Sequence, residues 1–211
     1  GYFRDVTEIT KVQESLSEVN RKLNLLSSIT WHDINNQLMI LEGNLAMLRA
    51  NHSTPKGDEH LNRAEAAGKR IASLIRFTKE YEGIGVRSAV WQNVSALVNK
   101  VSRDSNLGEV RVANDIPPGV EVFADPMIDK VFFNLVDNAV RHGGKVATIR
   151  FSAEEDSGAL TIICQDDGAG IPADRKGCLF VHDPDRDHGF GLFLSREILA
   201  ITGISIRENS G

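Results

Sequence analysis

Apolar or small residues recur at alternating spacings of three and four near the start of the chain, as in a helix that pairs along a seam. The seam residues are Ile9, Val12, Leu16, Val19, Leu23, Leu26 and Thr30. Because polar side chains separate them, this heptad repeat predicts a parallel coiled-coil dimer. From Leu26 to Leu38 the spacing becomes three successive fours, and such a stutter locally unwinds a supercoil. The irregularity lies at His32.

A second helix is predicted after a short interruption. Residues 51–57 consist of turn formers, including Pro55 and Gly57, and predict a break. Apolar or small residues then share one helix face from Asp58 to about Glu82. Two antiparallel helices of this kind expose a wide apolar stripe, and two copies of the pair would bury it as a dimeric four-helix bundle.

The pattern changes after Gly85, where short β-rich runs alternate with helical ones. This alternation predicts an α/β sandwich, in which helices cover one face of a mixed sheet. The expected strands are 110–114, 120–124, 146–152, 160–165 and 204–207, and the expected helices are 93–103, 126–142 and 192–202. The whole chain is therefore predicted to be an α+β multidomain protein.

Three motifs follow one another within this second region. They are Asn134-Leu135-Val136-Asp137-Asn138-Ala139, Asp166-Asp167-Gly168-Ala169-Gly170-Ile171 and Gly189-Phe190-Gly191-Leu192. Alone, each motif is more often an ordinary helix surface or turn. Together, they supply a carboxamide that can hold Mg²⁺ against phosphates, a carboxylate that can accept from an adenine amino group, and glycines whose N–H groups can approach phosphate oxygens. Their order within one domain predicts a nucleotide pocket.

His32 lies in the amphipathic helix as Trp31-His32-Asp33-Ile34-Asn35-Asn36. Without a nucleotide domain, a packing or surface histidine would be the better interpretation. With one, neutral imidazole is a suitable nucleophile for a phosphoryl group. Asp33 is adjacent and can orient or deprotonate the ring, while Asn36 lies one turn further on the same face.

These residues resemble those of sensor histidine kinases. Residues from about 85 onward look like the catalytic ATP-binding domain, a GHKL-type α/β sandwich, and residues 28–83 resemble the dimerisation and histidine-phosphotransfer hairpin. The opening Gly1-Tyr2-Phe3-Arg4-Asp5-Val6-Thr7-Glu8 is similar to the end of a PAS sensor domain. The resemblance implies three parts: 1–27, the PAS exit and signalling helix; 28–85, the phosphotransfer hairpin; and 86–211, the catalytic ATP-binding domain.

The resemblance also implies roles for individual residues. Asn138 would coordinate Mg²⁺, Asn134 and Arg141 would face the phosphates of ATP, and Asp166 would accept from the adenine amino group. Residues 172–188 would form a nucleotide lid with Phe180 as its hydrophobic anchor. The remaining nucleotide-binding positions would be His142, where the family often has an aromatic residue, Gly168, Gly170, Ile171, Gly189, Phe190, Gly191 and Leu192.

The implied function is autophosphorylation of His32 from Mg-ATP, followed by transfer to an aspartate on the receiver domain of a response regulator. Asn36 matches the family position associated with dephosphorylating that partner. Two alternatives are a GHKL-type ATPase, disfavoured because Asn134 stands where those enzymes carry a water-activating Glu, and a catalytically degenerate dimeric signalling scaffold. Intact His32, Asn138 and Asp166 disfavour the scaffold.

The amino-acid composition limits the classes of partner that this chain is expected to bind. A net charge of −5 with scattered Lys and Arg argues against nucleic-acid binding, which needs a basic surface. The sequence contains no run of about 18 apolar residues, which is the length a membrane span needs, although a longer parent protein could still be membrane-anchored. Cys164 and Cys178 lack metal-ligand spacing and suit a reducing compartment. We therefore expect a cytoplasmic segment that forms a homodimer.

Overall fold

The computed structural model describes residues 33–48, 55–181 and 190–209. The predicted seam over residues 9–30, His32 and Gly189 lie outside these residues. The chain divides into two compact units, Gly1–Glu80 and Tyr81–Gly211, which are described separately.

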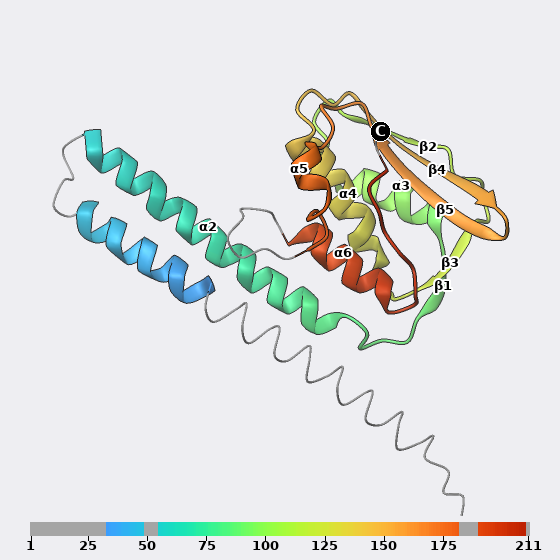
Figure 1. Cartoon of the computed structure of the whole chain (residues 1–211), viewed down its shortest axis with the longest axis horizontal. Coiled ribbons are helices and arrows are strands. Elements are labelled where there is room, and N and C mark those ends of the chain that lie inside the picture. The colour runs from blue at the N-terminus through green and yellow to red at the C-terminus, as the bar shows by residue number, and fades with distance from the viewer. Residues whose placement is uncertain (1–32, 49–54, 182–189, 210–211) are drawn as a thin grey trace, which may run out of the picture. The chain divides into compact units, whose positions relative to one another are not determined.

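The described residues of the first unit form two helices. Residues 33–48 form one, and α2 (Pro55–Gly83) is the other (Figure 1). Helix α2 begins three residues before the predicted start at Asp58, because proline's fixed φ suits the first helical position and its missing N–H would be unpaired there. Nδ1 of His60 lies 3.1 Å from Oδ1 of Asn44, which links the two helices. Pairing of two chains into a bundle stays a prediction.

Two small sheets lie in the described part of the second unit. In the first, β1 (Val90–Asn93) pairs antiparallel with β3 (Glu121–Ala124). In the second, β4 (Thr148–Asp156) lies between β2 (Arg111–Asn114), to which it is parallel, and β5 (Ala159–Asp166), to which it is antiparallel. The predicted mixed strand directions are confirmed, while the division into two sheets was not foreseen.

Among the described residues, the helices that accompany these sheets are α3 (Val94–Asp104), α4 (Ile128–His142), the short α5 (Ala173–Lys176) and α6 (Gly191–Ala200). Asn93 caps α3, because its Oδ1 accepts from the N–H of Ala96 at 2.8 Å. Helix α4 contributes Phe132 to the core, where its ring lies 5.8 Å from that of Phe151 on β4. Helix α4 also packs against α6 (Figure 1).

Three local features differ from the predictions. The expected strand over 204–207 is not formed, because β5 has no further hydrogen-bonded neighbour among the described strands and a lone extended segment makes no ladder. The strand β1 was not predicted, since its four residues run directly into α3 and were assigned partly to that helix. Helix α5 was also missed, because it lies within the segment interpreted as a lid.

Candidate nucleotide site

Helix α4 carries four of the predicted site residues. Its apolar face is buried through Val131, Val136 and Ala139, among others. Turning that face inward leaves Asn134 and Asn138 half-buried at its edge, while Arg141 and His142 are exposed in the last turn. The 3.6-residue period thus places the two carboxamides in one row.

Asn134 joins α4 to the start of α6. Its Nδ2 donates to the carbonyl oxygen of Gly191 at 2.8 Å and to Oγ of Ser195 at 3.1 Å. A Cβ on Gly191 would lie 3.1 Å from Cγ of Asn134, so the glycine makes room for the carboxamide. The structure therefore brings the first and third motifs together, with the nitrogen of Asn134 bound to α6.

Asn138 lies one turn further along α4. Its Nδ2 is buried and has no hydrogen-bond partner among the described residues. A buried amide donor without a partner is unfavourable, typically by about 1–3 kcal/mol. The amide donor of Asn138 is therefore left without a partner by the described part of the protein.

The C-terminal end of α4 meets the second motif. The carbonyl oxygen of Gly143 accepts from the N–H of Ala169 at 2.9 Å. A Cβ on Gly168 would lie 2.4 Å from that same oxygen and 2.7 Å from Oδ1 of Asp166. An added Cβ does not fit there, so Gly168 is needed because space is limited. Its φ lies outside the left-handed region, so backbone conformation is not the reason.

Asp166 ends β5 with an exposed carboxylate. Its Oδ1 accepts from the N–H of Gly168 at 2.9 Å, which orients the group. Its other oxygen, Oδ2, has no partner among the described residues. Gly170, two residues after Gly168 in the same turn, adopts a φ of 71°, a conformation that glycine takes without strain. The neighbouring Ile171 is half-buried.

Asp167 has a structural role that the sequence analysis missed. Its Oδ1 accepts from the N–H groups of Ala147 at 2.8 Å and Thr148 at 3.0 Å. These hydrogen bonds, first that of Thr148 and then that of Ala147, lower the pKa of the Asp167 carboxyl below its ordinary value. Asp167 thereby fastens the start of β4 to the end of β5, and its position beside Asp166 gave no signal of this.

The third motif begins α6. Phe190 occupies the N-cap position without a side-chain hydrogen bond, and Leu192 is half-buried. Arg141 of α4 pairs with Asp137 of the same helix at 2.7 Å, while its side chain remains 69% exposed and able to reorient. In the segment interpreted as a lid, Phe180 is half-buried, and its carbonyl oxygen accepts from Nη1 of Arg196 at 3.4 Å.

The predicted phosphotransfer residues belong to the other unit. Asp33 is half-buried and Asn36 is exposed on the helix over residues 33–48. His32 precedes the described residues, so the geometry of the His32–Asp33–Asn36 set stays a prediction.

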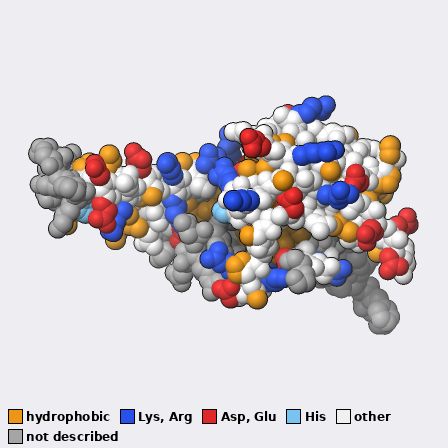
Figure 2. Space-filling model, turned by 90° about the horizontal axis from the view of Figure 1, so that it is seen from above, with side chains coloured by type: hydrophobic (Ala, Val, Ile, Leu, Met, Phe, Trp, Pro, Cys, Tyr) orange, Lys and Arg blue, Asp and Glu red, His pale blue; other side chains and the backbone are white. Residues whose placement is uncertain are grey.

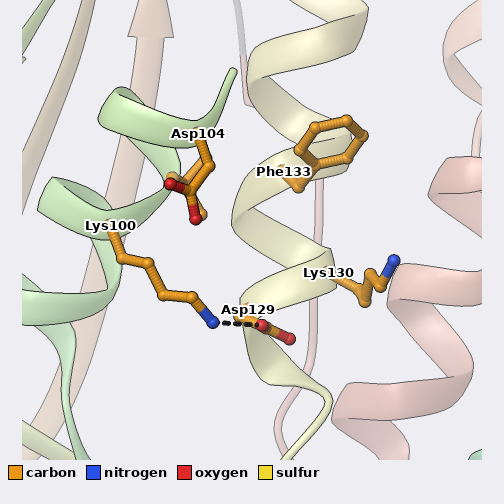
Figure 3. A pocket seen from close by; sticks show the side chains of 6 residues that line it. Lys100, Asp104, Asp129, Lys130 and Phe133 are labelled. Atoms are coloured by element: carbon orange, nitrogen blue, oxygen red, sulfur yellow. Dashed lines mark hydrogen bonds and ion pairs between the residues drawn. The ribbon is translucent and has the colours of Figure 1, made fainter.

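A hollow of about 180 Å³ lies between α3 and α4. Nζ of Lys100 lies 2.9 Å from Oδ2 of Asp129 across it, and Phe133 extends from α4 nearby (Figure 3). The hydrogen bond and the charge of Asp129 raise the pKa of Lys100. Because no predicted site residue lines this hollow, it is separate from the candidate nucleotide site.

The described residues show neither a metal cluster nor a membrane-spanning helix. In the described ranges, no group of three or more His, Cys, Asp or Glu side chains is arranged to hold a metal ion. None of the helices within those ranges is both long and apolar enough to cross a bilayer. On the face drawn in Figure 2, Lys and Arg side chains are interspersed with Asp and Glu side chains.

The C-terminal part of the chain is similar to a known protein family. Residues 125–211 match the family described as histidine kinase-, DNA gyrase B-, and HSP90-like ATPases. The alginate biosynthesis sensor protein KinB of Pseudomonas aeruginosa is 32% identical over 91 residues, which are 40% of this chain and 15% of KinB. The sensor protein kinase PilS of Pseudomonas aeruginosa is 23% identical over 93% of this chain and 39% of PilS.

The fold agrees with a solved structure. The histidine kinase AdeS of Acinetobacter baumannii has a TM-score of 0.53 and 21% identity, covering 81% of this chain and 86% of that chain. The match to PilS, by contrast, spans well under half of that relative's length. Residues 125–211 thus match a GHKL-type α/β ATP-binding domain, and the chain is similar to sensor histidine kinases.

Proposed function

We propose that this chain is the core of an ATP-dependent protein-histidine kinase. The observation that carries the proposal is that α4 contacts both glycine motifs. Asn134 binds the carbonyl oxygen of Gly191 at one point, and the carbonyl oxygen of Gly143 binds Ala169 at the other. Asn138 lies between these two points on the helix. An ATP molecule placed along α4 would therefore have the Asp166 turn at one end and the start of α6 at the other.

The charges suit that orientation. The exposed Asp166 carboxylate, held through Oδ1, offers Oδ2 to the adenine amino group. At the opposite end, the N-terminus of α6 and the glycines 189 and 191 offer backbone N–H groups to phosphate oxygens. Arg141 supplies a positive charge at the edge of α4. The other proposed contacts are His142, Gly168, Gly170, Ile171, Phe190 and Leu192.

Asn138 fits the predicted role toward Mg²⁺. Mg²⁺ prefers oxygen ligands and is usually bound by one or two protein groups together with substrate phosphates, so a single carboxamide oxygen is sufficient. The buried Nδ2 of Asn138, which has no hydrogen-bond partner among the described residues, is a donor that would pair with an acceptor such as a phosphate oxygen while Oδ1 faces the ion. When bound, the ion would neutralise phosphate charge; Asn138 would orient it.

The proposed reaction begins at His32. The neutral imidazole nitrogen attacks the γ-phosphorus, the bond from phosphorus to the bridging oxygen breaks, and ADP leaves. Asp33 orients the ring and accepts its proton. The phosphoramidate then passes its phosphoryl group to a carboxylate of a response regulator receiver domain. Asn36 is proposed to position water when that regulator is dephosphorylated.

A GHKL-type ATPase is the second candidate, and Asn134 disfavours it. Such enzymes activate water with a Glu at this position, whereas a carboxamide is not a base at neutral pH. Moreover, the nitrogen of Asn134 is bound to Gly191 and Ser195. A degenerate scaffold that binds no nucleotide is the third candidate, and it predicts no ATP affinity.

We propose the same three parts, 1–27, 28–85 and 86–211, with the hairpin as the dimerisation element. Large apolar side chains are exposed on the helices of the first unit, including Met39 at 70%, Met47 at 55% and Ile75 at 56%. Burying this surface against a second copy would remove it from water. Because ATP and a receiver domain are the proposed partners, the reaction is assigned to the cytoplasm.

The test is incubation of the whole chain with γ-labelled ATP and Mg²⁺, with nucleotide affinity measured separately. Wild type should take up acid-labile label, and His32→Ala should take up none while still binding ATP. Asn138→Ala should abolish Mg²⁺-dependent uptake, and Asp166→Asn should weaken ATP binding by roughly 1.5–3 kcal/mol, the value of a hydrogen bond to a charged group.

Matched controls use residues outside the site. Asn62→Ala changes an exposed carboxamide on α2, and Glu155→Gln neutralises an exposed carboxylate on β4. Both should behave as wild type. Acid-labile label in His32→Ala would move the phosphorylated residue elsewhere, and ATP hydrolysis without any labelled protein would favour the ATPase.

A further inference from the structure

Ser195 is a buried polar residue to which the sequence analysis gave no role. It lies in α6, one turn after Gly191, and its exposure is 0%. A hydroxyl removed from water in this way is unfavourable unless it is hydrogen-bonded. Its Oγ donates to the carbonyl oxygen of Gly191 at 2.8 Å.

The hydroxyl belongs to a closed network of three residues. Asn134 donates to both Oγ of Ser195 and the carbonyl oxygen of Gly191. The carbonyl oxygen can only accept, so the nitrogen of the Asn134 amide must face α6. Since Ser195 gives its single hydroxyl proton to Gly191, it can accept from Asn134. Every partner in the network is therefore matched.

This network acts on the backbone that the proposed function uses for phosphate binding. Gly191 is the first residue of α6 and the last glycine of its motif. The side chains of Asn134 and Ser195 both bind its carbonyl oxygen. Asn134 is one helical turn from Asn138 on α4. An alanine at residue 195 would fill the core nearly as well, but it would leave Asn134 with one acceptor fewer.

We propose that Ser195 is a positioning residue for the phosphates of the nucleotide. It fixes the start of α6 against α4, so that the Gly191 backbone and the Asn138 carboxamide address the same phosphate groups. This inference rests on the proposed function. It also assigns the nitrogen of Asn134 to support of α6, which differs from the phosphate contact expected from the sequence.

The test separates phosphate binding from adenine binding. The affinities of the whole chain for ADP with Mg²⁺ and for adenosine are measured by calorimetry. Ser195→Ala should weaken ADP binding roughly five- to tenfold, the effect of one net hydrogen bond, and should change adenosine binding less than about twofold. Because the residues form one network, adding Ser195→Ala to Asn134→Ala should cause little further loss.

The matched control is Ser95→Ala in α3. Oγ of Ser95 accepts from the Asn114 carboxamide at 3.1 Å, the same length as the bond between Asn134 and Ser195. This variant should lose comparable thermal stability and keep the ratio of ADP to adenosine affinity. If Ser195→Ala does not fold, Ser195→Cys, which keeps the shape with a weaker donor, is compared in the same way.

An unchanged affinity ratio in a folded Ser195 variant would overturn the inference, whether both affinities fall together or neither falls. Absence of ADP binding by wild type would instead defeat the proposed function. The two failures are therefore distinguishable.

Discussion

Gly168→Ala tests whether close packing of α4 against the Asp166 turn maintains the candidate nucleotide site. The added Cβ would lie 2.4 Å from the carbonyl oxygen of Gly143 and 2.9 Å from Cγ2 of Val146. Carbon and neighbouring heavy atoms ordinarily approach to about 3.5 Å, so the turn has to move by roughly 1 Å. Because one obstacle is backbone, rotation of a side chain cannot relieve the contact.

The cost follows from the hydrogen bonds that such a shift disturbs. They are the bond between Ala169 and Gly143 and the bond between Gly168 and Asp166. A neutral bond contributes about 0.5–1.5 kcal/mol net and one to a charged group about 1.5–3 kcal/mol. We therefore expect a loss of about 2–4 kcal/mol, together with displacement of the Asp166 carboxylate and weaker adenosine binding.

Urea unfolding of the whole chain followed by circular dichroism measures the first effect, and titration with adenosine measures the second. Gly177→Ala is the control, since a Cβ there meets nothing within 4 Å. It should remain within about 0.5 kcal/mol of wild type. A Gly168→Ala variant with the stability and adenosine affinity of wild type would show that the turn is not held by this contact.

Two further predictions concern a buried carboxylate and a half-buried thiol. Asp125 is 1% exposed, and its carboxylate accepts from the N–H groups of Gly85 and Met127 at 2.8 Å each. Asp125→Ala should therefore lower the free energy of unfolding by about 3–5 kcal/mol. A loss below about 1 kcal/mol, measured by urea titration, would contradict this prediction. Burial, and secondarily the charge of Asp166, raises the pKa of Cys164 from 9.0 to about 12. Since the native thiol keeps its proton where the unfolded one ionises, this contribution is present below pH 9 and is lost as pH rises toward 12. Cys164→Ala should accordingly lose less stability than wild type between pH 9 and pH 11, and parallel losses would refute the assignment.

Local structure was largely predictable because its causes are local. The periods of α2 and α4 gave helices whose ends differ from the expected ones by a few residues. The strands β4 and β5 followed from their β-rich runs, although they extend further because the Ser157-Gly158 turn, with φ values of 51° and 82°, closes a tight hairpin. The strand predicted over 204–207 is not formed. Its residue types favour a strand, but no described strand pairs with it.

The sequence by itself determined which chemical groups are present, in which order, and on which kind of element each lies. Asn134 and Asn138 had to share a helix face, and Asp166 had to end a strand. Only the tertiary structure decided what each group touches. The nitrogen of Asn134 donates to Gly191 and Ser195, and Asp167 binds the backbone at the start of β4. Gly168 is needed because a side chain there would collide with Gly143. The physical reason is that these contacts join residues 19 or more positions apart, and their geometry depends on how α4 packs against α6 and meets the turn after β5.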